Sequence, residues 1–98
     1  METTEPQHHH HEHQHDYVLV SVYTTSGAFP RQGEERVKST ERVETFLREA
    51  AKHLHLTDTT GWVARVGGSE INTSRSFTED GLTGTVKIQW GPPEGGGG

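Results

Sequence analysis

The sequence contains no cysteine and no long apolar run. Without cysteine, the chain cannot form a disulfide, use a thiol in catalysis or build a thioester on its own side chains. No stretch approaches the roughly 18 apolar residues of a membrane helix, and none has the apolar core of a signal peptide. We therefore expect neither feature and place the protein in the cytoplasm.

Apart from Met1, large apolar side chains are also missing from both ends of the chain. Residues 1–16 and 91–98 contain no Val, Ile, Leu, Phe, Trp or Tyr. Because burial of apolar surface drives folding, such segments cannot contribute to a core. We predict a disordered His-rich tail at 1–16, one folded domain at 17–90 and a flexible Pro/Gly tail at 91–98.

The charged residues divide along the same boundaries. Residues 17–90 hold nine acidic and nine basic side chains, so the domain is neutral. The net charge of −5 comes from five acids at the ends: Glu2, Glu5, Glu12, Asp16 and Glu94. A neutral domain lacks the basic surface of a nucleic-acid-binding protein, and we expect no nucleic-acid partner. We also expect a monomer, because few large apolar residues face outward.

Two strands are predicted in the first part of the domain. Between Tyr17 and Tyr23, every second residue is a valine, which is typical of a strand with one buried face. The alternating residues are Val18, Leu19, Val20, Ser21 and Val22. A second strand is expected from Phe29 to about Val37. Pro30 would lie at an edge or bulge of this strand, because proline has no N–H to donate.

The next segment predicts one amphipathic helix. Its apolar residues recur at spacings of three and four: Val43, Phe46, Leu47, Ala50, Ala51 and Leu54. This spacing places them on one side of a helix. Ser39 or Thr40 should cap its start, because a side-chain oxygen can accept a hydrogen bond from a free N–H of the first turn.

After the helix, the sequence predicts three further short elements. Trp62–Val66 and Ser69–Ile71 should form a hairpin on a glycine turn. A helical turn is expected at 77–82, beginning at Thr78, and Thr85–Trp90 should be the last strand. One helix across a mixed sheet of four or five strands would bury both the helix stripe and the alternating valines. The predicted class is therefore α+β in two layers.

The order of these elements resembles the ubiquitin-like β-grasp family over nearly all of residues 17–98. The resemblance includes the leading hairpin, the helix and two further segments, Arg65-Val66-Gly67-Gly68-Ser69-Glu70-Ile71 and Phe77-Thr78-Glu79-Asp80-Gly81-Leu82. It also includes a last strand that runs into a glycine tail. The chain is most similar to the prokaryotic, bacterial members. The resemblance implies a β-grasp fold with one helix packed across the sheet.

The resemblance also implies a function for the C-terminus. Such proteins are modifiers whose terminal carboxylate is adenylated with ATP by an activating enzyme, then carried as a thioester and conjugated to target proteins. The implied partners are an activating enzyme, a conjugating enzyme, a JAB-type metalloprotease that removes the modifier, and the targets. The chain would be their substrate and not itself an enzyme, and it would need no cofactor of its own.

The candidate conjugation residues are the terminal glycines Gly95, Gly96, Gly97 and Gly98. A carboxylate is a poor acyl donor, so it must reach the nucleotide site of another protein to be activated. Residues 91–98 could span about 26 Å when extended, and glycines fit a narrow channel because they have no side chains. If modifier chains form, the side-chain amines that could accept them are those of Lys38, Lys52 and Lys87.

Two departures from the ubiquitin pattern affect the expected partners. Arg65 and Gln89 match positions where ubiquitin has an apolar patch, so the usual readers of that patch should not bind. Pro92, Pro93 and Glu94 replace the arginines before the diglycine of ubiquitin. A eukaryotic activating enzyme is therefore not expected as a partner.

Two other functions remain open. A sulfur carrier has the same fold and end, but its Gly98 becomes a thiocarboxylate. Against it, the eight-residue tail is long for delivery into a compact synthase site. The third possibility is a binding domain that is never conjugated and has an incidental glycine end.

Histidines and tryptophans are the remaining candidate site residues. Six histidines lie in the N-terminal tail: His8, His9, His10, His11, His13 and His15. Imidazoles bind zinc or nickel, but a tail without fixed geometry binds weakly, so we interpret it as a solvated segment and assign no metal site. His53 and His55 should have structural roles at the helix end. Trp62 and Trp90 should lie in the core or at its edge.

Overall fold

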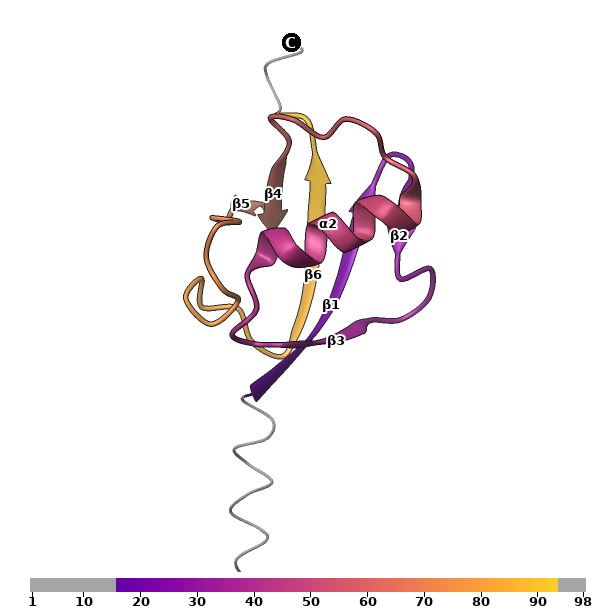
Figure 1. Cartoon of the computed structure of the whole chain (residues 1–98). Helices are drawn as coiled ribbons and strands as arrows, with labels where there is room; N and C mark the ends of the chain where they lie inside the picture. The colour runs from indigo at the N-terminus through magenta and orange to yellow at the C-terminus, as the bar shows by residue number, and fades with distance from the viewer. Residues whose placement is uncertain (1–15, 94–98) are drawn as a thin grey trace, which may run out of the picture.

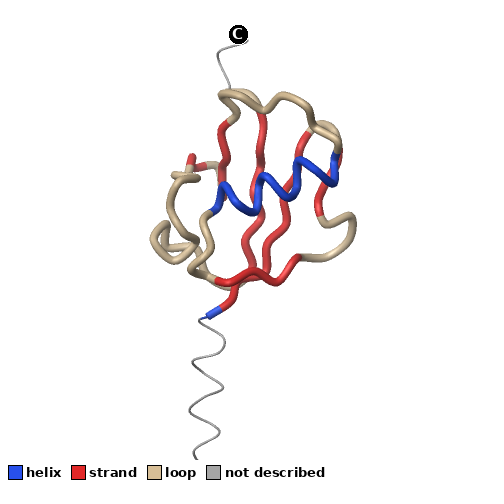
Figure 2. The backbone as a smooth tube through the Cα atoms, in the orientation of Figure 1, coloured by secondary structure: helices blue, strands red, loops and turns tan. Residues whose placement is uncertain are grey.

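The computed structural model describes residues 16–93, which form a sheet with one helix lying across it (Figure 1). The strands are β1 (Tyr17–Thr24), β2 (Gly27–Phe29), β3 (Glu35–Lys38), β4 (Val63–Val66), β5 (Ser69–Glu70) and β6 (Thr85–Gly91), and the helix is α2 (Val43–Leu54). The strand order is β2-β1-β6-β4-β5, and β3 also pairs with β1. The predicted α+β arrangement of one helix on a mixed sheet is confirmed (Figure 2).

The two longest strands, β1 and β6, lie side by side and parallel at the centre of the sheet. Val20 is opposite Val86 and Val22 is opposite Ile88, and all four are buried. The predicted alternation of buried valines is therefore confirmed. Because the strands are parallel, the described chain enters β1 at one end of the sheet and leaves β6 at the other (Figure 1).

The predicted second strand forms two separate strands. β2 and β3 both pair antiparallel with β1, while residues 30–34 between them make no strand pairing. Pro30 directly follows β2, and its missing N–H ends the ladder there. The sheet thus has six strands rather than the expected four or five.

Helix α2 buries most of the predicted apolar stripe. Its four fully buried residues are Val43, Phe46, Leu47 and Ala50. Ala51 and Leu54 are partly exposed at the C-terminal end. The four buried residues form one core cluster with the central valines, and Ala51 packs against it.

The start of α2 differs from the prediction. The helix begins at Val43 with Arg42 as its N-cap residue and no side-chain cap, so neither Ser39 nor Thr40 caps it. Carbonyls of a distant loop accept the hydrogen bonds of the helix start instead. The Val43 N–H donates to the Arg75 carbonyl at 3.0 Å, and the Glu44 N–H donates to the Thr73 carbonyl at 2.8 Å. The backbone before the helix also forms hydrogen bonds with this loop. For example, the Thr78 N–H donates to the Ser39 carbonyl at 2.9 Å.

The end of α2 is closed by His55 in a left-handed conformation. Its φ is 58°, and its N–H donates to the carbonyl of Lys52 at 3.3 Å. The N–H of Leu56 donates to the carbonyl of Ala51 at 2.9 Å. This pair of bonds satisfies carbonyls that the helix cannot satisfy itself.

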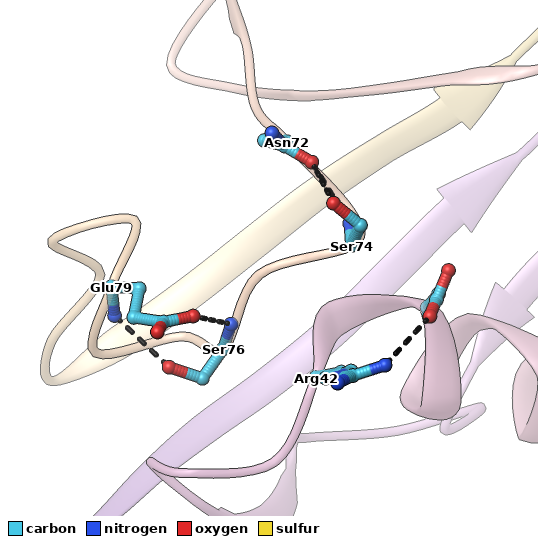
Figure 3. A network of polar contacts seen from close by, with 6 residues as sticks. Arg42, Asn72, Ser74, Ser76 and Glu79 are labelled. Atoms are coloured by element: carbon cyan, nitrogen blue, oxygen red, sulfur yellow. Dashed lines mark hydrogen bonds and ion pairs between the residues drawn. The ribbon is translucent and has the colours of Figure 1, made fainter.

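The loop between β5 and β6 is anchored by Phe77, which is fully buried. Its ring lies edge-on to that of Phe46, with centroids 6.4 Å apart. The Ser76 N–H donates to the Glu79 carboxylate at 3.0 Å, and the Glu79 N–H donates to the Ser76 hydroxyl at 3.1 Å (Figure 3). This reciprocal capping box begins the predicted turn, so its first residue is Ser76 and not Thr78.

Candidate functional site

The candidate site is the point where the C-terminal segment leaves the sheet. β6 lies between β1 and β4, and its last residue, Gly91, still pairs with Val63 of β4. Pro92 and Pro93 follow and are exposed. Because proline has no N–H, neither can extend the sheet ladder. The domain therefore holds the chain as far as Gly91 and releases it at one end of the sheet.

The four predicted conjugation residues, Gly95–Gly98, lie outside the described residues, which end at position 93. What the structure defines is the base from which they extend. That base is a central strand that pairs with β1 over residues 85–89 and with β4 over residues 88–91. The pairing of β6 with β4 thus sets the direction in which the chain leaves the sheet.

Two tryptophans pack beside this exit. Trp90 immediately precedes Gly91, is 9% exposed and lies opposite Ala64 of β4. Its ring meets that of Trp62 edge to face, with centroids 5.1 Å apart and planes at 81°. Such an aromatic pair adds about 0.5–1.5 kcal/mol to the effect of burial alone. The prediction that both residues lie in the core or at its edge is confirmed.

The three candidate acceptor lysines are exposed and belong to different elements. Lys38 ends β3 opposite Tyr17, and Lys52 lies in the last turn of α2. Lys87 lies on β6 opposite Ser21. None of the three amines is blocked by the fold of residues 16–93. Their role as acceptors remains a prediction.

The sheet face away from α2 is here called the outer face. It consists of the odd-numbered residues of β1 and β6, together with their outward-pointing partners on neighbouring strands. Gln89 belongs to it and lies opposite Arg65 of β4, whereas the alternate residues Trp90 and Ala64 are buried. The two positions that depart from the ubiquitin pattern are thus direct neighbours on this surface.

The contribution of Arg36 to the outer face was not predicted from the sequence. Its guanidinium lies 4.2 Å from the centre of the Tyr17 ring, an arrangement typical of a cation–π contact. Arg36 is opposite Leu19 in the β1–β3 pair. Period-2 alternation could have placed it outward, but the break after Pro30 hid the limits of β3.

The histidines divide into two groups. The six tail histidines lie outside the described residues. His53 stacks on Phe29, with ring centroids 4.5 Å apart, and lies 3.3 Å from the Glu49 carboxylate, while His55 closes the helix. The structural roles predicted for both are confirmed. Within residues 16–93, no group of three or more His, Cys, Asp or Glu side chains could hold a metal ion.

Comparison with known proteins identifies the fold. The sequence matches no protein-family model and no curated protein. Among solved structures, the chain is similar to a de novo designed protein based on ubiquitin, with a TM-score of 0.62 and 17% identity over 85% of this chain and 96% of that one. A likeness at this identity establishes the fold alone, which is the ubiquitin-like β-grasp. No helix within residues 16–93 is long and apolar enough to cross a membrane.

Proposed function

We propose that this chain is a prokaryotic ubiquitin-like protein modifier that is conjugated to target proteins through Gly98. The observation that supports this is the combination of a ubiquitin-like domain with a glycine run that follows its central strand. β6 ends at Gly91, two prolines follow, and residues 95–98 are all glycine. The proposal takes Gly98, the last residue of the sequence, as the mature end.

The chemistry requires activation of the Gly98 carboxylate, followed by three transfers of its acyl group. The Gly98 carboxylate first attacks the α-phosphorus of ATP, and pyrophosphate leaves. A cysteine thiolate of the activating enzyme then takes the acyl group, and AMP leaves. After exchange to a conjugating enzyme, a target amine or hydroxyl attacks the thioester and releases the thiol. The chain itself supplies the carboxylate and a tail that fits the partner's channel, and it catalyses none of the steps.

The described residues at the start of the tail suit this role. Pro92 and Pro93 favour an extended polyproline II conformation and keep the tail from adding to the sheet. From Gly91 onward, eight residues could extend about 26 Å, enough to enter a partner's nucleotide site. A JAB-type metalloprotease would cleave the new bond after Gly98. We place these reactions in the cytoplasm, where ATP and reduced thiols are available.

The test is the intact mass of the protein after incubation with ATP in a lysate of its own host. The wild-type chain is compared with a chain that lacks all four glycines, Gly95–Gly98, and a control chain has Lys38, Lys52 and Lys87 replaced by arginine. We expect high-mass adducts that require ATP and the four terminal glycines. The arginine variant should still form single adducts, but it should lose any ladder that is built through lysine.

The other outcomes of the same measurement decide against the proposal. A mass change equal to the exchange of one oxygen for sulfur at the C-terminus would identify a sulfur carrier. Adducts that persist without the four glycines would show attachment through another group, and no ATP-dependent change would leave a binding domain that is not conjugated. The unreacted wild-type mass also shows whether the protein ends at Gly98 in its host.

A further inference from the structure

The outer face has an unequal distribution of charge. It carries four of the nine basic residues of the chain: Arg36, Lys38, Arg65 and Lys87. Of the ten acidic residues within 16–93, the strand register places only Glu70, opposite Arg65, on this face. The other described surfaces therefore carry nine acids against five bases. The neutral domain is thus polarised, with its positive charge collected on one side of the sheet.

The four basic side chains are not neutralised within the domain. The ion pairs of the described residues, Arg42 with Glu44 and His53 with Glu49, lie on the helix and at its start. None of the four outer-face bases takes part in them. Three of these four are exposed, and Arg65 is partly exposed, so their charges are available to a partner.

Apolar and aromatic groups lie among these charges. Leu19 and Tyr23 are 42% and 44% exposed, and they are the exposed large hydrophobic residues of the described chain. Both point outward from β1, and Tyr17 extends the same row. Ser21, between them, is only 1% exposed, so other parts of the domain cover it. The row from Tyr17 to Tyr23 extends along about 20 Å of β1, the length of a strand of some six residues.

We propose that the outer face is the docking surface for an acidic segment of a partner protein, in which aspartate or glutamate alternates with aliphatic or aromatic residues. Carboxylates would pair with Arg36, Arg65 and Lys87, and the apolar residues would cover Leu19 and Tyr23. The opposite charge of the partner would speed association and exclude basic competitors. This proposal does not depend on the reaction of Gly98, because it concerns a different surface.

A protein segment fits this face better than nucleic acid or a membrane. A nucleic acid or an anionic membrane presents charge over a length much greater than the face, and the acidic remainder of the domain would repel it. A segment of about six to eight residues stays within the positive area. It can also bury Leu19, for which a phosphate backbone offers no apolar contact.

The test uses the full chain and a fluorescent peptide of about eight residues that alternates glutamate with leucine or tyrosine. Its control peptide has glutamine at every glutamate position. We expect saturable binding of the acidic peptide only, with NMR shift changes centred on Leu19, Tyr23 and Gln89. The double variant Arg36→Glu, Lys87→Glu should bind about tenfold more weakly, because two exposed charge pairs turn from attractive to repulsive. The matched variant Arg48→Glu, on α2, should bind like the wild type.

Several results would overturn the proposal. Equal binding of the two peptides would show that charge does not matter, and equal binding by the double variant would place the site elsewhere. Absence of saturable binding up to about 1 mM peptide would exclude an acidic segment as the partner. Tighter binding of duplex DNA, or of vesicles with phosphatidylserine, would assign the face to another class of ligand. Adducts at Gly98 are measured separately, so loss of peptide binding and loss of conjugation remain distinguishable.

Discussion

Replacing Phe77 with alanine should remove most of the stability of the domain. Phe77 is fully buried and belongs to the loop whose carbonyls satisfy the first N–H groups of α2. A buried Phe→Ala substitution costs about 3–5 kcal/mol, and the contact with Phe46 places this site in the upper part of that range. Small domains of this size have a free energy of unfolding of about 4–12 kcal/mol, so the variant would keep little stability.

Urea unfolding followed by tryptophan fluorescence measures this effect, because Trp62 and Trp90 pack together beside the core. With a slope of about 1 kcal/mol per molar urea, Phe77→Ala should lower the midpoint by several molar or abolish the folded baseline. Phe77→Leu keeps much of the buried volume and should lose about 1 kcal/mol, which keeps the measurement possible.

Tyr23→Ala is the control for this comparison, since it removes an aromatic ring of similar size from a side chain that is 44% exposed. Its midpoint should fall much less than that of Phe77→Ala. If the alanine variant at Phe77 unfolds within about 1 M urea of the wild type, its ring does not anchor the loop to the core. The assignment of the loop as a structural clamp on α2 would then be wrong.

Three smaller perturbations test other parts of the same fold by urea unfolding. Ser76→Ala and Glu79→Ala should each lower the free energy of unfolding by about 1 kcal/mol. The double variant should lose less than the sum of the two, because both substitutions break one capping box; additive losses would contradict the reciprocal bonds. Gly68→Ala should cost about 1 kcal/mol because φ is 86° there, whereas Gly91→Ala should be nearly neutral; equal costs would argue against the glycine turn. Burial raises the pKa of the Asp80 carboxyl, so ionisation of this group disfavours the folded state as pH rises above 3.8. Asp80→Asn should therefore be more stable than the wild type at pH 7, and the difference should shrink in acid. A gain in stability that is independent of pH would refute this.

The parts of the fold that could be predicted from sequence are those with local periodicity. The helix stripe from Val43 to Leu54 and the alternating valines of β1 define their buried faces by spacing alone. The glycine turn between β4 and β5 follows from positive φ angles that glycine adopts readily. These features respond to neighbours within a few residues, so one sequence suffices to find them.

The parts that could not be predicted depend on residues far apart in the chain. The cap of α2 was assigned to Ser39 or Thr40, but Arg75 and Thr73, some thirty residues away, satisfy the helix start. The split of the second strand follows from how β1 can pair with both halves around Pro30. Distant backbone groups that meet in the fold leave no local pattern in the sequence.

For the candidate functions, sequence and tertiary structure contributed different things. The glycine run at 95–98 and the prolines before it belong to the sequence itself, and they are the basis for proposing Gly98 as the reactive end. The outer face is a property of the fold, because Arg36, Arg65 and Lys87 are distant in sequence. They come to share a surface with Leu19 and Tyr23 only when β3, β4 and β6 join β1 in one sheet. Strand pairing fixes which side chains share a surface, and that pairing is decided by burial of the whole core rather than by any short segment.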